Sequence, residues 1–149
     1  MINDNLKLLG DVAIVLKDKD GNVKDSREIN NLVVSAGLTY ICSRMAGASP
    51  GVMSHMALGS GTTAASAGQT DLVSILGSRE ALDSSTASSN TITYVSSFEA
   101  GEGTGAVTEA GIFNASSGGT MLCRTVFSVV NKDADDTMSV TWTITLTAS

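Results

Sequence analysis

The chain contains a single histidine, His55, which follows Ser54. A serine, a histidine and an acid can form a hydrolytic triad, but only when the fold fixes their geometry. Gly59-Ser60-Gly61 is not the Gly-x-Ser-x-Gly turn of hydrolases, and no other spacing indicates such a site. Because His55 alternates with Met53 in a strand pattern, we interpret it as an exposed or partly buried strand residue. We predict no catalytic residues and no enzyme.

Two acidic turns are the candidates for metal binding. Asp18-Lys19-Asp20-Gly21 is similar to the start of a calcium loop, but position twelve of that loop would be Ile29, which cannot ligate a cation. The turn is therefore predicted to join two strands of a hairpin, with Gly21 at positive φ. The cluster of Asp133, Asp135 and Asp136 has the same interpretation, so we predict no metal site.

Neither the cysteines nor the glycine-rich segment predicts a cofactor. Two distant cysteines and one histidine are too few ligands for zinc. Cys42 and Cys123 lie in apolar neighbourhoods, so we expect two free, buried thiols, with a single disulfide as the alternative. Gly101-Glu102-Gly103-Thr104-Gly105 lacks the Gly-Lys-Ser/Thr end of a phosphate-binding loop and is interpreted as a flexible connection.

Glu109 is predicted to lie within a strand, close to a glycine, Gly111. Such a pair favours a β-bulge or a close approach of another backbone, with the carboxylate accepting hydrogen bonds from a neighbouring loop. Arg79 and Arg124 are the candidate ionic partners. We expect a structural ion pair here.

Composition limits the partners of the chain. Its net charge of −6 and its nine scattered basic residues argue against nucleic-acid binding. No apolar run approaches the ~20 residues that span a bilayer, so no membrane partner is predicted. Met1–Asn5 has neither the basic nor the apolar region of a signal peptide, which favours synthesis in a cytoplasm. These five residues are a possible flexible N-terminal arm.

The last segment gives the clearest structural signal. From Met138 to Thr147, large apolar residues alternate with serine and threonine. A period of two places the apolar side chains on one face of a strand and the hydroxyls on the other. Seven further strands are predicted from similar patterns: Leu6–Leu16, Val23–Val34, Met53–Leu58, Arg79–Leu82, Thr91–Glu99, Val107–Ala115 and Met121–Val130.

One helix is predicted over Ala36–Ala46, with Ser35 as its cap. Leu38, Ile41, Cys42 and Met45 recur at helical spacing and are expected to face the core. Asp83–Asn90 contains small polar residues and is predicted to be a flexible loop. Residues 1–149 are thus expected to form one all-β domain, an antiparallel sandwich and specifically an eight-stranded jelly roll with one short helix.

Five segments carry a resemblance to known proteins: 31–38 (NLVVSAGL), 56–63 (MALGSGTT), 78–82 (SREAL), 108–124 (TEAGIFNASSGGTMLCR) and 140–144 (VTWTI). In this order the chain resembles small virion structural proteins of tailed bacteriophages. Related β-modules occur in capsid cement, or decoration, proteins and in tail or head fibre proteins. The compact β-domain of this chain is more similar to the cement type.

The resemblance implies a non-enzymatic protein, made in the host bacterial cytoplasm, that binds the outer capsid surface. Its partners would be the major capsid protein and further copies of itself, as a dimer or trimer, and it would stabilise the shell by bridging capsomers. The Ser/Thr faces and Met1–Asn5 are the expected contact surfaces. The alternative is a tail fibre, collar or receptor-binding component, in which Asp83–Asn90 would face a host glycan. A hydrolase using His55 is the weakest alternative.

Overall fold

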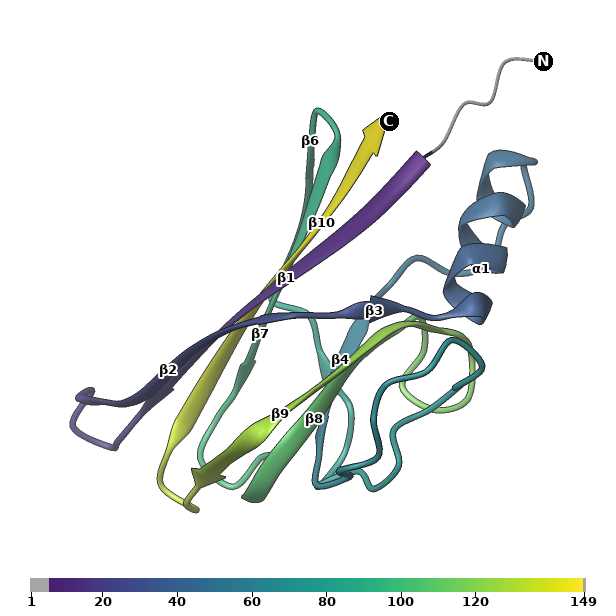
Figure 1. Cartoon of the computed structure of the whole chain (residues 1–149). Coiled ribbons are helices and arrows are strands. Elements are labelled where there is room, and N and C mark those ends of the chain that lie inside the picture. The colour runs from purple at the N-terminus through teal and green to yellow at the C-terminus, as the bar shows by residue number, and fades with distance from the viewer. Residues whose placement is uncertain (1–5, 149) are drawn as a thin grey trace.

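Two antiparallel β-sheets pack face to face in the computed structural model, which describes residues 6–148 (Figure 1). In spatial order, the first sheet contains β2 (Val23–Asn30), β1 (Leu6–Lys17), β10 (Thr137–Ala148), β7 (Thr91–Phe98) and β6 (Ser84–Ser88). The second contains β3 (Leu32–Val33), β9 (Met121–Lys132), β8 (Gly105–Phe113), β4 (His55–Gly59) and β5 (Glu80–Ala81). We refer to them as the β1–β10 sheet and the β8–β9 sheet. An all-β sandwich is confirmed.

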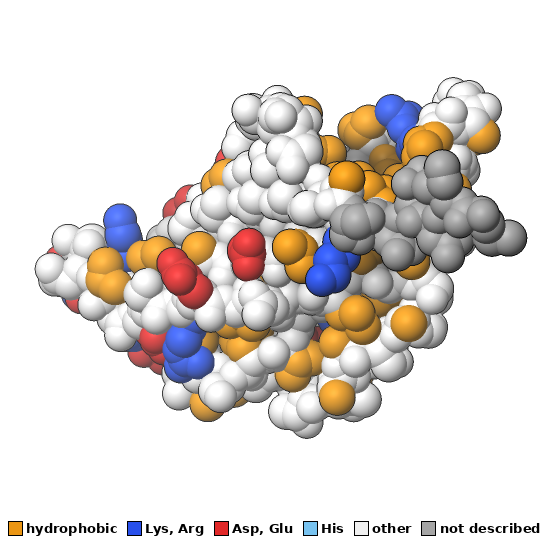
Figure 2. Space-filling model, turned by 45° about the horizontal axis from the view of Figure 1, so that its top comes forward, with side chains coloured by type: hydrophobic (Ala, Val, Ile, Leu, Met, Phe, Trp, Pro, Cys, Tyr) orange, Lys and Arg blue, Asp and Glu red, His pale blue; other side chains and the backbone are white. Residues whose placement is uncertain are grey.

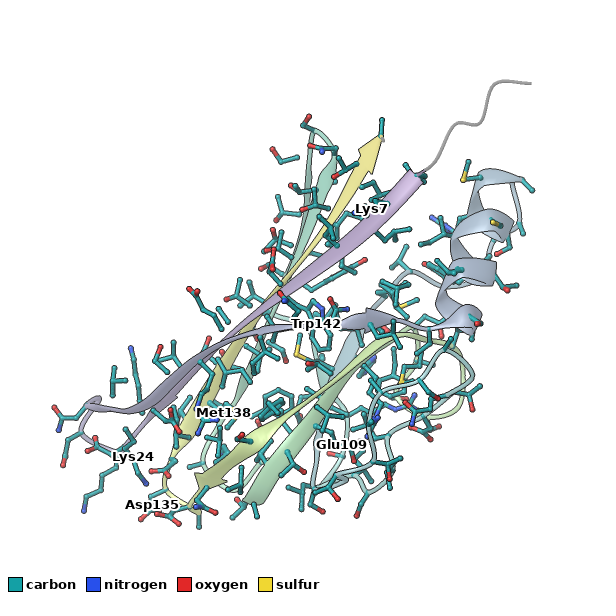
Figure 3. The ribbon with its side chains drawn as sticks, viewed as in Figure 1. Lys7, Lys24, Glu109, Asp135, Met138 and Trp142 are labelled. Atoms are coloured by element: carbon teal, nitrogen blue, oxygen red, sulfur yellow. The ribbon has the colours of Figure 1, made fainter. Side chains whose placement is uncertain are left out.

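The alternation in β10 has the predicted effect. Val140 and Trp142 are fully buried, while Thr141 and Thr143 between them stay partly exposed. β10 pairs along its whole length with β1, Trp142 lying opposite Val12. Trp142 and Met138 lie between the two sheets (Figure 3). The core therefore forms where the apolar faces of both sheets meet.

Residues 6–148 form ten strands where eight were predicted, and two local events account for the difference. The predicted strand Val23–Val34 divides at Asn31: β2 stays in the β1–β10 sheet, and β3 pairs with β9 in the other sheet. The predicted loop Asp83–Asn90 contains strand β6, which pairs with β7. That prediction was wrong because a strand at a sheet edge can form from backbone pairing without an apolar face.

Strands from the two ends of the sequence keep one feature of a jelly roll. The first long strand pairs with the last, and the continuation of the second strand pairs with the penultimate one. Strands from the middle of the sequence instead pair with a sequence neighbour, as in β6–β7 and β8–β9.

Helix α1 (Ser35–Met45) forms as predicted but presents a different face. Ser35 begins the helix, and no side chain caps its amino end. Leu38 and Met45, expected in the core, are 43% and 80% exposed, whereas Gly37 is buried. A Cβ on Gly37 would lie 2.2 Å from the Leu122 carbonyl oxygen, so the helix packs its backbone directly against β9. This close approach turns the apolar stripe partly toward solvent.

A third layer covers the outer face of the β8–β9 sheet. The long connection between β4 and β5 packs there through Leu72, which joins Phe113 and Met121 in a second small core. The cysteines are both free, but only Cys123 is buried; Cys42 lies exposed on α1, contrary to expectation. The outer face of the β1–β10 sheet has no such cover among residues 6–148.

Candidate functional site

A buried ion pair lies between the β8–β9 sheet and the connection that covers it. Glu109 on β8 and Arg124 on β9 are both fully buried, and their Oε2 and Nη2 atoms lie 2.8 Å apart (Figure 3 labels Glu109). Arg124 also donates to the Thr63 carbonyl and to Gln69 Oε1, each at 2.9 Å. Of the two predicted partners, Arg124 is confirmed. Arg79 instead stacks on the Phe113 ring and lies 3.6 Å from Asp71.

The carboxylate of Glu109 holds the connection by its backbone. Glu109 Oε1 accepts from the amides of Gly61 and Ser74 at 2.9 and 2.8 Å, and Oε2 accepts from Val73 at 3.1 Å. A Cβ on Gly61 would lie 2.5 Å from Oε1, so only glycine allows this approach. Of the two predicted alternatives, the close approach of another backbone is confirmed, and the β8–β9 register also shifts between Val107 and Glu109.

The hydrogen bonds keep Glu109 ionised. Burial alone raises the pKa of this carboxyl, but donation from Ser74, Val73, Arg124 and Gly61 outweighs burial, and its pKa lies below the usual value. A carboxylate whose oxygens are occupied in this way has no free position for a substrate. The group acts as a clamp that fastens the third layer to the sandwich.

His55 lies at the start of β4 and is partly buried, as predicted. Ser54 Oγ lies 2.8 Å from its Nδ1, but the two residues are adjacent in sequence. No acidic side chain of the described residues hydrogen-bonds to His55. The structure therefore brings two members of a triad together without the third.

The acidic turns are tied to the protein's own groups. Asp18 Oδ1 accepts from the amides of Asp20 and Asn22, both at 2.9 Å, which closes the β1–β2 turn. At the turn between β9 and β10, Lys24 Nζ lies 3.0 Å from Asp133 and 2.6 Å from Asp136 (Figure 3 labels Lys24 and the neighbouring Asp135). Among residues 6–148, no three side chains of metal-binding type gather into a possible ion site.

The outer face of the β1–β10 sheet is left uncovered by the other described elements. We call it the hydroxyl face. At its centre lie Thr141, Thr143 and Thr145 of β10, next to Thr91 and Thr93 of β7. A groove of about 510 Å³ crosses this face, where Thr141 and Thr143 line it together with Asp11 of β1 and Glu28 of β2. Figure 2 shows the charged groups as separate spots within broad uncharged areas.

A second groove, of about 320 Å³, separates α1 from the β6–β7 hairpin and is mainly apolar. Tyr40 and Met45 of α1 line one side, and Ile92 and Ser85 line the other. We call it the helix groove. Sequence reasoning missed it because the exposure of Met45 depends on the close approach at Gly37.

Comparison with known proteins gives no relative. No family model, no curated protein and no solved structure matches this chain. In the part of the chain that the structure describes, no helix has both the length and the apolar character that crossing a membrane requires.

Proposed function

We propose that the chain is a non-enzymatic structural protein of a bacteriophage virion, of the capsid decoration type. It binds the outer capsid surface, with the major capsid protein and other copies of itself as partners, and bridges neighbouring capsomers. Met1–Asn5, the predicted arm, lies outside the described residues, so the proposal rests on the sandwich.

The hydroxyl face carries this proposal. Its threonines project from strands whose opposite faces are locked in the core, so they are held in fixed positions without additional ordering cost. Short hydroxyl side chains can donate and accept hydrogen bonds and permit close contact with another protein surface. The asymmetry between a covered sheet and an open one supports binding through the open one.

Rigidity supports the same function. The buried core joins the two sheets, and the clamp at Glu109 fastens the third layer to the β8–β9 sheet, so the three layers form one body. A protein that reinforces a shell stabilises it by binding the assembled state in preference to separated subunits. Two contacts made by one rigid body strengthen each other through effective concentration.

The test is binding to tailed-phage particles stripped of this chain, compared with binding to disassembled capsid subunits. We expect saturation at a large, symmetry-related copy number on particles and a rise in the temperature at which they release DNA. Thr143→Arg, on the hydroxyl face, should weaken binding at least tenfold. Ser117→Arg, on an exposed turn next to the β8–β9 sheet, should not.

Two results would overturn the proposal. One is equal binding to particles and to free subunits. The other is a few copies located at the tail vertex, which would favour a tail fibre, collar or receptor-binding component.

A further inference from the structure

Strand β6 is an exposed sheet edge. It is the last strand of the β1–β10 sheet, and all five of its residues are exposed. One side of its backbone pairs with β7, so the alternate N–H and C=O groups on the other side have no strand partner in the described chain. Figure 1 shows the β6–β7 hairpin projecting beside the end of β10.

The other three edges of the described sheets are short or bridged. β3 and β5 have two residues each. The β2 edge faces β9, and Arg27 donates across this gap to the carbonyls of Ser128 and Val129 at 3.0 and 3.1 Å. β6 has none of the usual protections of an edge, since Ser84–Ser88 contains no lysine, no proline and no register shift.

The edge is also held in place. Asn90, in the β6–β7 turn, donates from its side chain to the Leu146 carbonyl at 3.0 Å and accepts from the Leu146 amide at 2.9 Å. The hairpin is therefore fixed to β10 before any partner binds. Pairing along β6 then costs little additional conformational entropy.

The helix groove opens beside the same edge, because Ser85 of β6 is one of its lining residues. Met45 and Val52, which also line it, are 80% and 61% exposed. A partner lying along β6 would thus meet both unpaired backbone groups and apolar side chains. Together they supply more contact area than a five-residue strand alone.

We infer that the β6 edge and the helix groove form the contact between two copies of this chain, related by a two-fold axis through Thr86. In this antiparallel register Thr86 faces its own counterpart, and Ser85 faces Ala87 of the second copy. The two β1–β10 sheets become one continuous sheet. Both helix grooves then lie on the same side of it, near the axis.

Charge favours a second copy over another partner. The chain has a net charge of −6, so two copies repel each other over most of their surfaces. Ser84–Ser88 carries no charge, and among the described residues that line the helix groove only Arg44 is charged. A basic partner would be attracted to the acidic turns instead. At the uncharged β6 edge, two copies can meet without the charge repulsion that opposes self-association elsewhere on the surface. An isologous contact of this kind closes at two copies.

Engineered disulfides test the register. Cys42 is exposed, so the background is Cys42→Ser. In an antiparallel pair, residues opposite each other at a non-hydrogen-bonded position have Cα atoms about 4.5 Å apart, which a disulfide can span. Thr86→Cys should form a covalent dimer at least tenfold faster than Ser26→Cys, a matched exposed position on β2. Equal rates would overturn the register and the contact.

Sedimentation velocity tests the association of the unmodified chain. We expect a reversible monomer–dimer equilibrium whose Kd rises at least tenfold in Thr86→Lys and less than twofold in Ser26→Lys, which adds the same charge. Met45→Ser should weaken the dimer severalfold. A monomer at every concentration, a trimer, or equal effects of the two lysines would each overturn the inference. The inference rests on the self-association in the proposed function, but this experiment contains no capsid, so the two can fail separately.

Discussion

At the scale of single residues, the buried pair of Glu109 and Arg124 shows how charge can serve structure. Two buried charges are costly unless their remaining polar atoms find partners. Here the carboxylate receives three backbone N–H groups from the covering connection, and the guanidinium donates to two oxygens of the same connection. The pair therefore adds to the apolar contacts that Leu72 of the same connection makes with the sheet.

Glu109→Gln should lower the free energy of unfolding by about 3–5 kcal/mol, because it leaves the buried Arg124 charge without its counter-ion. Urea unfolding at pH 7 measures this. In hydrogen exchange, the amides of Gly61, Val73 and Ser74 should lose more protection than those of β10. Glu28→Gln, at an exposed position of β2, is the matched control and should change stability by less than about 0.5 kcal/mol.

A different result would contradict the clamp. If the connection keeps its protection in Glu109→Gln, apolar packing at Leu72 holds it instead, and the carboxylate is dispensable.

Among residues 6–148, Trp142 is the largest fully buried side chain, and its indole N–H has no hydrogen-bond partner there. Trp142→Ala should cost about 3–5 kcal/mol through lost burial and a residual cavity. Trp142→Phe should cost clearly less, since it keeps most of the packing and removes an unsatisfied donor. Thermal and urea unfolding of both variants measure the difference. A mild effect of Trp142→Ala would place the energetic centre of the core elsewhere.

At the scale of elements, strands with a strict period of two were predictable from the sequence. β1, β7 and β10 each bury one face, so their patterns carry the signal directly. β6 was not predictable in this way, because its backbone alone pairs and its side chains all face solvent. The ion pair at Glu109 was predictable from a glutamate near a glycine within a predicted strand and from the two candidate arginines. Its backbone donors, separated from it by 35 to 48 residues, were not.

The helix shows why periodicity alone misassigned a buried face. Leu38 and Met45 predicted a core-facing stripe, but Gly37 allows the backbone of α1 to approach β9 more closely than any side chain would. Packing of one small residue overrode the apolar pattern. The exposed apolar residues that result form the wall of the helix groove.

Gly37→Ala gives a prediction in which packing and helix propensity have opposite signs. Propensity alone would stabilise the helix by about 1 kcal/mol. The new Cβ would instead clash with the Leu122 carbonyl, so we expect a net loss of about 1–3 kcal/mol. Gly68→Ala is the control, since nothing lies within 4 Å of its Cβ position, and it should be close to neutral. Thermal unfolding measures both, and a stabilised Gly37→Ala variant would contradict the packing of α1 on β9.

At the scale of the whole molecule, the two sheets have different surroundings. The β8–β9 sheet lies between the core and a third layer, while the β1–β10 sheet faces solvent with its hydroxyls and its free β6 edge. In the function proposed above, the covered side serves stability and the open side serves contact. Acid can test how much Glu109 contributes to the stability of the β8–β9 side, because its carboxyl group titrates.

The pKa of Glu109 is lowered in the folded state, so below pH 4–5 the unfolded chain binds more protons than the folded one. The stability that Glu109 contributes is fully present above its unfolded pKa of about 4.3 and is lost as the pH falls through the lower folded value. Asp25 follows the same rule, its pKa being lowered by hydrogen bonding to Arg27, but this pair is 30% exposed and screened by salt. Urea midpoints measured from pH 7 to pH 2 should therefore fall with acid even in 1 M NaCl. In Glu109→Gln the fall at high salt should be much smaller, because the buried group no longer titrates. An unchanged acid dependence in that variant would show that exposed carboxylates, rather than the clamp, govern the stability of the fold at low pH.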